Sequence, residues 1–194
     1  MTETGTDQRQ TNILLGAWNT FATYGYKKTS MDDIARAAGM SRPALYLHYR
    51  NKEDIFRSLT EHFYEVTAHE LEAALAEEGS VAERISAAFA AQGGQLVKDM
   101  LTSPHGRELL ESGKSISNDV ALAGEARLKS IYTEWLRKED RAGRVQLSAE
   151  AESVAATITA ALKGLKMVTM DYPAYQQSLA NLAALFGAGL TRRG

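Results

Sequence analysis

Arg42 carries a long side chain with several hydrogen-bond donors, which could read a nucleic-acid base. Its guanidinium can donate two parallel hydrogen bonds to O6 and N7 of guanine in the major groove of DNA. The same group can equally pair with a phosphate, so the residue alone leaves both contacts open. Either contact requires an element that projects Arg42 toward DNA, and the neighbouring residues predict one.

The segment from Thr29 to Lys52 predicts two short helices joined by a turn. Ser30 is a good N-cap for the first helix, and Gly39 ends it because glycine readily takes the left-handed conformation. Ser41 caps the second helix, and Pro43 suits its first turn. This pattern is typical of a helix-turn-helix, whose second helix lies in the major groove. The exposed face of this second helix would carry Arg42, Pro43, Ala44, Tyr46 and Leu47.

A wider set of residues stands in a familiar order and spacing: Phe21, Gly25, Thr29, Ile34, Ala35, Ala38, Gly39, Ser41, Leu45, Tyr46, Tyr49, Lys52 and Glu53. From about Gln10 to Phe56 the chain therefore resembles the DNA-binding domain of TetR-family transcriptional regulators. Beyond Phe56 the resemblance is one of length and helical layout. Leu47 departs from it, since relatives often carry a polar or aromatic residue there.

The resemblance implies contacts between this domain and the DNA backbone. The candidates that it supplies are Thr29, Ser30, Ser41, Tyr46, His48 and Lys52. Lys28, which immediately precedes the motif, is a further candidate, because a loop lysine at that position can contact phosphate or simply remain solvated.

Three residues, His62, Glu65 and His69, are spaced to share roughly one face of a helix, which raises the question of a zinc site. Zinc would need a further ligand such as His105, and nothing in the sequence places that residue nearby. No metal and no cofactor are therefore expected. The sequence also lacks a His/Asp/Ser constellation and a glycine-rich phosphate loop, so an enzyme is not expected.

Composition favours a soluble protein with a basic N-terminal part. The 194 residues are 44% hydrophobic and 24% charged, and they include no cysteine. Residues 1–58 carry eight Lys/Arg and six Asp/Glu, a net charge of +2 within a chain of net charge −2. No segment approaches the roughly 20 apolar residues of a membrane span, and no signal-type run is present. We expect a cytoplasmic protein without membrane contact.

Hydrophobic periodicity predicts an all-α protein of nine helices. The resemblance implies that these helices take a TetR-like arrangement. Residues 1–9 are expected to form a flexible arm, and residues 10–52 a three-helix DNA-binding domain. Residues 53–194 would form a helical domain for ligand binding and dimerisation. One helix is expected across residues 80–100, although Gly93-Gly94 interrupts its apolar stripe.

The last two expected helices, residues 148–170 and 173–191, carry small residues four positions apart. These pairs allow close helix approach, either within the chain's own core or between two chains. The resemblance favours a homodimer through these two helices. The interface candidates are Ala160, Gly164, Leu165, Val168, Leu179, Leu182, Ala183, Phe186, Gly187 and Leu190.

Polar or soft side chains on otherwise apolar stripes could line a cavity for a small-molecule effector. For any one of them, a place in the core or at a rim is the commoner outcome. The candidates are His62, Val66, His69, Phe89, Gln92, Met100, Tyr132, Trp135, Thr159 and Lys163.

Together these features predict a dimeric regulator of transcription that binds double-stranded DNA at a palindromic operator. The expected form is a repressor that a small-molecule ligand releases. The alternative is a DNA-binding regulator that a partner protein controls, or that acts constitutively, with a filled core in place of a cavity.

Overall fold

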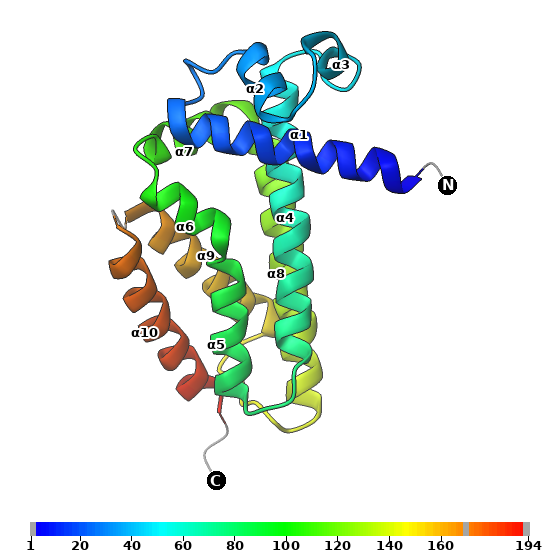
Figure 1. Cartoon of the computed structure of the whole chain (residues 1–194). Coiled ribbons are helices and arrows are strands. Elements are labelled where there is room, and N and C mark those ends of the chain that lie inside the picture. Colours follow the sequence, from blue (N-terminus) through cyan, green and yellow to red (C-terminus); the bar gives the residue numbers. More distant parts are fainter. Residues whose placement is uncertain (1–2, 169–170, 192–194) are drawn as a thin grey trace. The chain divides into compact units, whose positions relative to one another are not determined.

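The computed structural model describes residues 3–168 and 171–191, apart from the side chains of residues 3–7 and of residue 96 (Figure 1). Within these ranges it contains ten helices and no strand, which confirms the all-α architecture. The helices are α1 (Glu3–Tyr24), α2 (Met31–Ala37), α3 (Arg42–Tyr46), α4 (Lys52–Ala76), α5 (Val81–Gln92), α6 (Gln95–Thr102), α7 (Gly106–Ile116), α8 (Asn118–Arg141), α9 (Ala151–Val168) and α10 (Tyr172–Leu190).

Two helix boundaries differ from the sequence-based expectation. The helix expected across residues 80–100 is divided into α5 and α6 at Gly93-Gly94, where two glycines lower the helix propensity. Helix α1 begins at Glu3, so the described part of the expected arm, residues 3–9, is helical. Its Glu, Gln and Arg residues are compatible with a helix.

The chain divides into two compact units. The N-terminal unit comprises Met1–Phe63 and Thr102–Ala121, and the second unit comprises Tyr64–Leu101 and Leu122–Gly194. Helices α4 and α8 contribute residues to both units. This division differs from the expected boundary at residues 52–53, because α7 and the start of α8 group with the helix-turn-helix.

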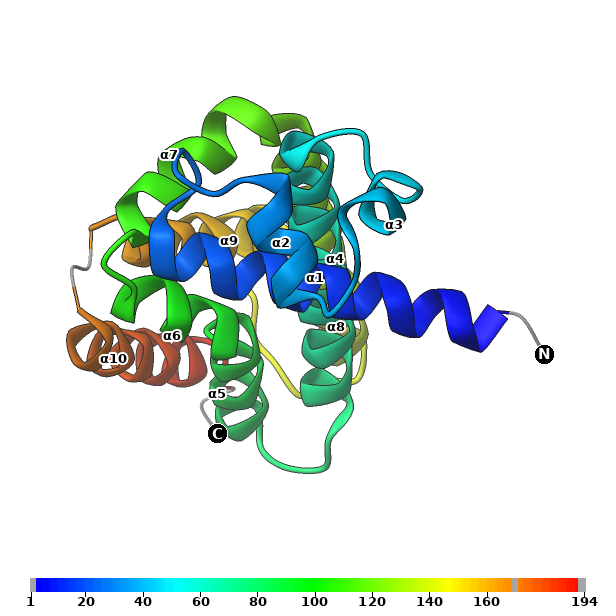
Figure 2. The same cartoon turned by 45° about the horizontal axis from the view of Figure 1, so that its top comes forward.

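Helix α7 and the turn before it contact the end of α1 and the loop that follows α1, which explains this grouping within the N-terminal unit (Figure 2). The Ser103 hydroxyl donates to the carbonyl of Ala22 at 2.6 Å, and the backbone N–H of Lys27 donates to Glu108 Oε1 at 2.8 Å. Gly25 has a φ of 83°, and a Cβ there would collide with the Glu108 carboxylate. The turn after α1 therefore requires glycine for both its conformation and its contact with α7.

Arg57 joins α4 to the start of α8 within the same unit. Its guanidinium donates to both carboxylate oxygens of Asp119, at 2.7 and 2.6 Å, and to the carbonyl of Ile116 at 2.8 Å. The hydrogen bonds from Arg57 lower the pKa of Asp119 to about 2. This bidentate geometry holds the α7–α8 corner against α4.

The second unit has a core formed largely where α10 packs on α5 (Figure 1). The ring of Phe89 meets those of Tyr132 and Phe186 edge-on, with centroids 6.3 and 5.8 Å apart. A Cβ at Gly187 would lie 2.9 Å from Ala82 Cβ, so this glycine permits the close approach of the two helices.

Glu139 is a buried carboxylate, 1% exposed, held between two arginines in the second unit. It accepts from Arg84 Nη2 at 2.7 Å, from Arg144 Nε at 2.6 Å and from Arg144 Nη2 at 3.0 Å. These bonds, chiefly those from Arg144, lower the pKa of Glu139 to about 2. The carboxylate thereby joins the segment after α8 to α5.

Candidate nucleic-acid interface and effector region

The helix-turn-helix forms with the caps that the sequence predicts. The Ser30 hydroxyl accepts from the N–H of Asp33, whose carboxylate accepts from the N–H of Ser30 in return. The Ser41 hydroxyl accepts from the N–H of Ala44 at 3.3 Å, and Gly39 lies in the left-handed region with a φ of 68°. These local bonds fix the ends of α2 and α3, and with them the direction of α3.

Helix α3 presents its predicted candidates on its outer face. Leu45 and Tyr49 are buried and anchor it, and Ala44 is half-buried. The exposed candidates in this segment are Arg42, Pro43, Tyr46, Leu47 and His48. Leu47 is 86% exposed, so a large apolar side chain stands on the candidate interface, where it could contact a thymine methyl.

Arg42 is held by neighbours on two helices. Its Nη1 donates to Asp32 Oδ2 at 3.2 Å, and its Nη2 donates to the Tyr46 hydroxyl at 3.3 Å. The contact with Tyr46, followed by that with Asp32, raises the pKa of Arg42 above its ordinary value. Asp32 is not among the residues predicted from the sequence, because no local pattern places it beside a side chain ten residues later.

Lys52, predicted to contact phosphate, makes three hydrogen bonds within the chain. Its ammonium donates to the carbonyls of Tyr26, Thr29 and Lys27 at 2.8, 3.0 and 3.2 Å, and it lies 4.6 Å from the Tyr26 ring centroid. An ammonium has three N–H donors, so all of them are engaged. The structure thus gives Lys52 the role of closing the loop between α1 and α2.

Replacing Lys52 by alanine is expected to lower the free energy of unfolding by about 2 kcal/mol, since hydrogen bonds to a charged group are lost. Chemical denaturation measures this change. Lys27→Ala is the matched control, because that side chain is exposed on the same loop. An unchanged stability, together with a salt dependence of DNA binding reduced by about one ion, would instead favour a phosphate contact.

The remaining backbone candidates differ in their accessibility. Thr29 is 3% exposed, and its hydroxyl donates to the carbonyl of Gly25 at 2.7 Å. That hydroxyl is therefore directed inward, contrary to the expected DNA contact. Lys28, Ser30 and Ser41 are exposed, as is Arg50, which the sequence argument passed over although it lies between α3 and α4.

Four of the predicted effector-binding residues are buried in the second unit: Phe89, Gln92, Tyr132 and Trp135. The Tyr132 hydroxyl donates to Gln92 Oε1 at 2.9 Å, which places a polar pair inside an apolar core. Arg84 lies over the Trp135 ring, 5.4 Å from its centroid.

The other effector candidates lie at the surface or partly exposed. Val66, His69 and Lys163 are exposed, and Lys163 donates to Glu125 at 2.8 Å. Met100 and Thr159 are half-buried, and the Thr159 hydroxyl donates to the carbonyl of Ala155. His62 is half-buried in the N-terminal unit. The exposed residues, Val66 and His69 on α4 and Lys163 on α9, lie away from the apolar side of their helices.

Tyr175 is a buried polar residue that the sequence argument missed. It is 1% exposed, and its hydroxyl has no hydrogen-bond partner among the residues that the structure describes. Burial raises its pKa to about 12. A Cβ on Gly93 would lie 3.2 Å from this hydroxyl, so Tyr175 reaches the break between α5 and α6.

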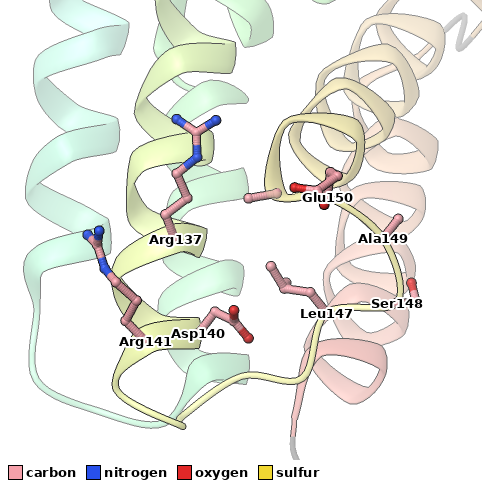
Figure 3. A pocket seen from close by; sticks show the side chains of 8 residues that line it. Arg137, Asp140, Arg141, Leu147, Ser148, Ala149 and Glu150 are labelled. Atoms are coloured by element: carbon pink, nitrogen blue, oxygen red, sulfur yellow. The ribbon is translucent and has the colours of Figure 1, made fainter.

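An open pocket of about 470 Å³ lies where α8 ends and α9 begins (Figure 3). It includes none of the predicted effector residues, and its two arginines are balanced by two carboxylates. Its lining residues are Arg137, Asp140, Arg141, Leu147, Ser148, Ala149, Glu150 and Ala151.

The predicted dimer residues divide between the surface and the chain's own core. Leu179, Ala183, Gly187 and Leu190 are buried in the second unit, so their assignment to an intermolecular surface is corrected. Leu165, Leu182 and Phe186 are half-buried. Ala160, Gly164 and Val168 are exposed on α9, and the exposed Met167 and Leu185 were missed.

The described part of the chain also bears on the metal and membrane expectations. No group of three or more His, Cys, Asp or Glu side chains gathers there as metal ligands would. His69 is exposed and His62 half-buried on α4. None of the described helices combines the length and apolar character needed to cross a bilayer.

Comparison with known proteins finds a family model that matches the helix-turn-helix. Residues 13–59 match the family model of bacterial regulatory proteins of the tetR family. The HTH-type transcriptional repressor Rv1474c of Mycobacterium tuberculosis is 28% identical over 166 residues, 81% of this chain and 80% of that protein. The HTH-type transcriptional repressor AcnR of Corynebacterium jeikeium is 26% identical over 170 residues, 85% and 83% of the two chains.

A solved structure resembles the whole fold. The complex of SmeT with triclosan aligns with a TM-score of 0.70 at 18% identity, covering 96% of this chain and 93% of that one. The match to the family model coincides with the capped helix-turn-helix, and the relatives named above are transcriptional regulators and not enzymes. Residues 13–59 therefore match the tetR family of bacterial regulatory proteins, and the chain is a DNA-binding transcriptional regulator.

Proposed function

We propose that the protein is a homodimeric repressor that binds a palindromic operator through α3 and leaves it when a small molecule binds the second unit. The observation that carries this proposal is the outward face of α3, where Arg42 and Tyr46 stand exposed above buried anchors. Two such helices, about 34–36 Å apart, would meet successive major grooves on one side of DNA.

The exposed apolar side of α9 and α10 supports the dimer. Val168 and Leu185 are each 72% exposed, and Met167 is 43% exposed. A Cβ at Gly164 would meet nothing within 4 Å, so this glycine leaves room for a second chain to approach. Exposed large apolar side chains on neighbouring helices are what a surface covered by another protein would carry.

Leu185→Glu is expected to convert the dimer into a monomer, because it places a charge in the proposed apolar interface. Sedimentation velocity measures the mass, and circular dichroism checks that the helical content is kept. Leu122→Glu, at a leucine 55% exposed on α8, is the matched control and should remain dimeric. A dimeric Leu185→Glu variant would place the interface elsewhere.

Buried polar groups in the second unit support a ligand site there. The Gln92–Tyr132 pair and the Tyr175 hydroxyl, which has no partner among the described residues, lie among apolar side chains, as the few polar groups of ligand sites do. The SmeT structure contains triclosan, which shows a ligand bound to that protein of the same fold. We therefore place the effector of this chain near the α5–α6 break.

A two-step experiment tests ligand release. Thermal-shift screening of the full-length protein with small apolar and aromatic compounds identifies binders, and fluorescence anisotropy then measures operator affinity with and without each. An effector is expected to lower operator affinity about 5- to 150-fold, the range of a typical allosteric coupling. Binders that leave the operator affinity unchanged would favour control by a partner protein or constitutive action.

A further inference from the structure

Asp32 of α2 faces Arg42 of α3 across the turn of the helix-turn-helix. Arg42 Nη1 donates to Asp32 Oδ2 at 3.2 Å, and Nη2 donates to the Tyr46 hydroxyl at 3.3 Å. The guanidinium carbon also lies 5.5 Å from the centroid of the Tyr46 ring. The two charged side chains are 55% and 50% exposed. The guanidinium is thus restrained by two partners while its outer side remains open to solvent.

The number of hydrogens on Arg42 allows these contacts to persist on DNA. A guanidinium carries five N–H donors in a planar fork, and Asp32 and Tyr46 take two of them. A bidentate contact with guanine O6 and N7 requires two more. Arg42 can therefore pair with a base without giving up either neighbour.

We propose that Asp32 is a positioning residue for base recognition, holding Arg42 in the orientation that reads guanine. A move of Arg42 toward a phosphate would separate it from Asp32. The carboxylate also repels any phosphate that approaches the guanidinium. Asp32 thereby makes the contact of Arg42 with a phosphate less favourable than its contact with guanine. Part of the sequence specificity would then come from repulsion of the wrong contact. This inference rests on the proposed function, since it assumes that α3 enters the major groove.

The expected size of the effect follows from the exposure of the pair. Exposed ion pairs change an equilibrium by roughly 1.4- to 5-fold. A two-fold symmetric complex contains the pair twice, so removal of the Asp32 charge should change discrimination by roughly 2- to 25-fold.

The experiment compares two duplexes. The wild-type full-length protein first selects its preferred duplex from a random-sequence pool. The base pair at which Arg42→Ala loses its preference is then replaced in both half-sites of a second duplex. Fluorescence anisotropy gives the affinity for each duplex, and discrimination is the ratio of the two. Asp32→Asn should lower this ratio roughly 2- to 25-fold, with an unchanged thermal unfolding midpoint showing that the variant is folded.

Two controls separate positioning from a general charge effect. Glu53→Gln removes one exposed carboxylate from the same unit and should leave the discrimination ratio unchanged. In a protein that already carries Arg42→Ala, Asp32→Asn should also leave the ratio unchanged, because its target is gone. A double-mutant cycle of this kind isolates the coupling between the two residues.

Each other outcome contradicts the inference in a recognisable way. Full discrimination by Asp32→Asn would show that Arg42 needs no carboxylate. Equal gains in affinity for both duplexes, with or without Arg42, would show that Asp32 merely repels DNA. Both results would leave the proposed function intact. If the wild-type protein selected no duplex at all, the proposed function would fail, and the inference with it.

Discussion

Arg42→Ala is expected to lower operator affinity by about 30-fold or more, one of the two largest effects that we predict. A bidentate arginine–guanine contact contributes about 1–3 kcal/mol, and a symmetric complex would contain two of them. The loss should be confined to duplexes with the preferred base pair. Affinity for unrelated duplexes should change little, because only one exposed charge per chain is removed.

Arg36→Ala is the matched control for this substitution. Arg36 is an exposed arginine of α2 in the same unit, and its contact with Asp33 at 3.7 Å is a weak surface pair. Anisotropy measurements at several salt concentrations separate sequence preference from general electrostatics. Equal losses for the two variants on all duplexes would assign Arg42 to phosphate contact and would move base recognition to other residues of α3.

Glu139→Gln is expected to lower the free energy of unfolding by about 3–5 kcal/mol, the usual result of removing one partner from a buried ion pair. The substitution leaves Arg84, whose side chain is 11% exposed, without its charged partner. Chemical denaturation measures the change. Glu152→Gln is the control, because Glu152 forms an exposed pair with Lys129 and should cost less than about 1 kcal/mol.

The Glu139 carboxylate also makes the free energy of unfolding depend on pH in the acid range. The pKa of Glu139 falls from its ordinary value of 4.5 to about 2 in the folded chain. The stabilisation is therefore complete above the unfolded-state pKa and is lost as the pH falls from about 4.5 toward 2. Glu139→Gln should lose less stability than wild type across this interval. Parallel acid-unfolding curves for the two proteins would contradict the assignment.

Local signals explain what could be predicted from the sequence. The caps at Ser30 and Ser41 and the left-handed Gly39 act within a few residues, so the helix-turn-helix could be derived before any tertiary contact was known. The buried anchors Leu45, on α3, and Tyr49, shortly after it, followed from their spacing of four residues. These local signals were therefore enough to predict that the Arg42 side chain is exposed on α3.

Long-range packing explains what could not be predicted. Small residues recur on both α9 and α10, and periodicity does not tell which pair packs within the chain. Ala183 and Gly187 pack within the second unit, where Gly187 meets Ala82 of α5, whereas Ala160 and Gly164 remain exposed. The three carbonyls around Lys52 likewise come from a loop more than twenty residues earlier. Such neighbours depend on tertiary geometry, which no local pattern encodes.

The three loop carbonyls that accept hydrogen bonds from the Lys52 ammonium have a practical consequence for interpreting salt titrations. The Lys52 ammonium, which is part of the chain, supplies beside these carbonyls the positive charge that a bound cation would otherwise have to supply. Direct ammonium–carbonyl bonds of 2.8 to 3.2 Å are screened far less than contacts across a hydrated surface. The DNA-binding motif should keep its shape from low to high ionic strength and in the presence of chelators. Loss of operator binding on addition of salt will then report counterion exchange at the phosphates, and not melting of the motif.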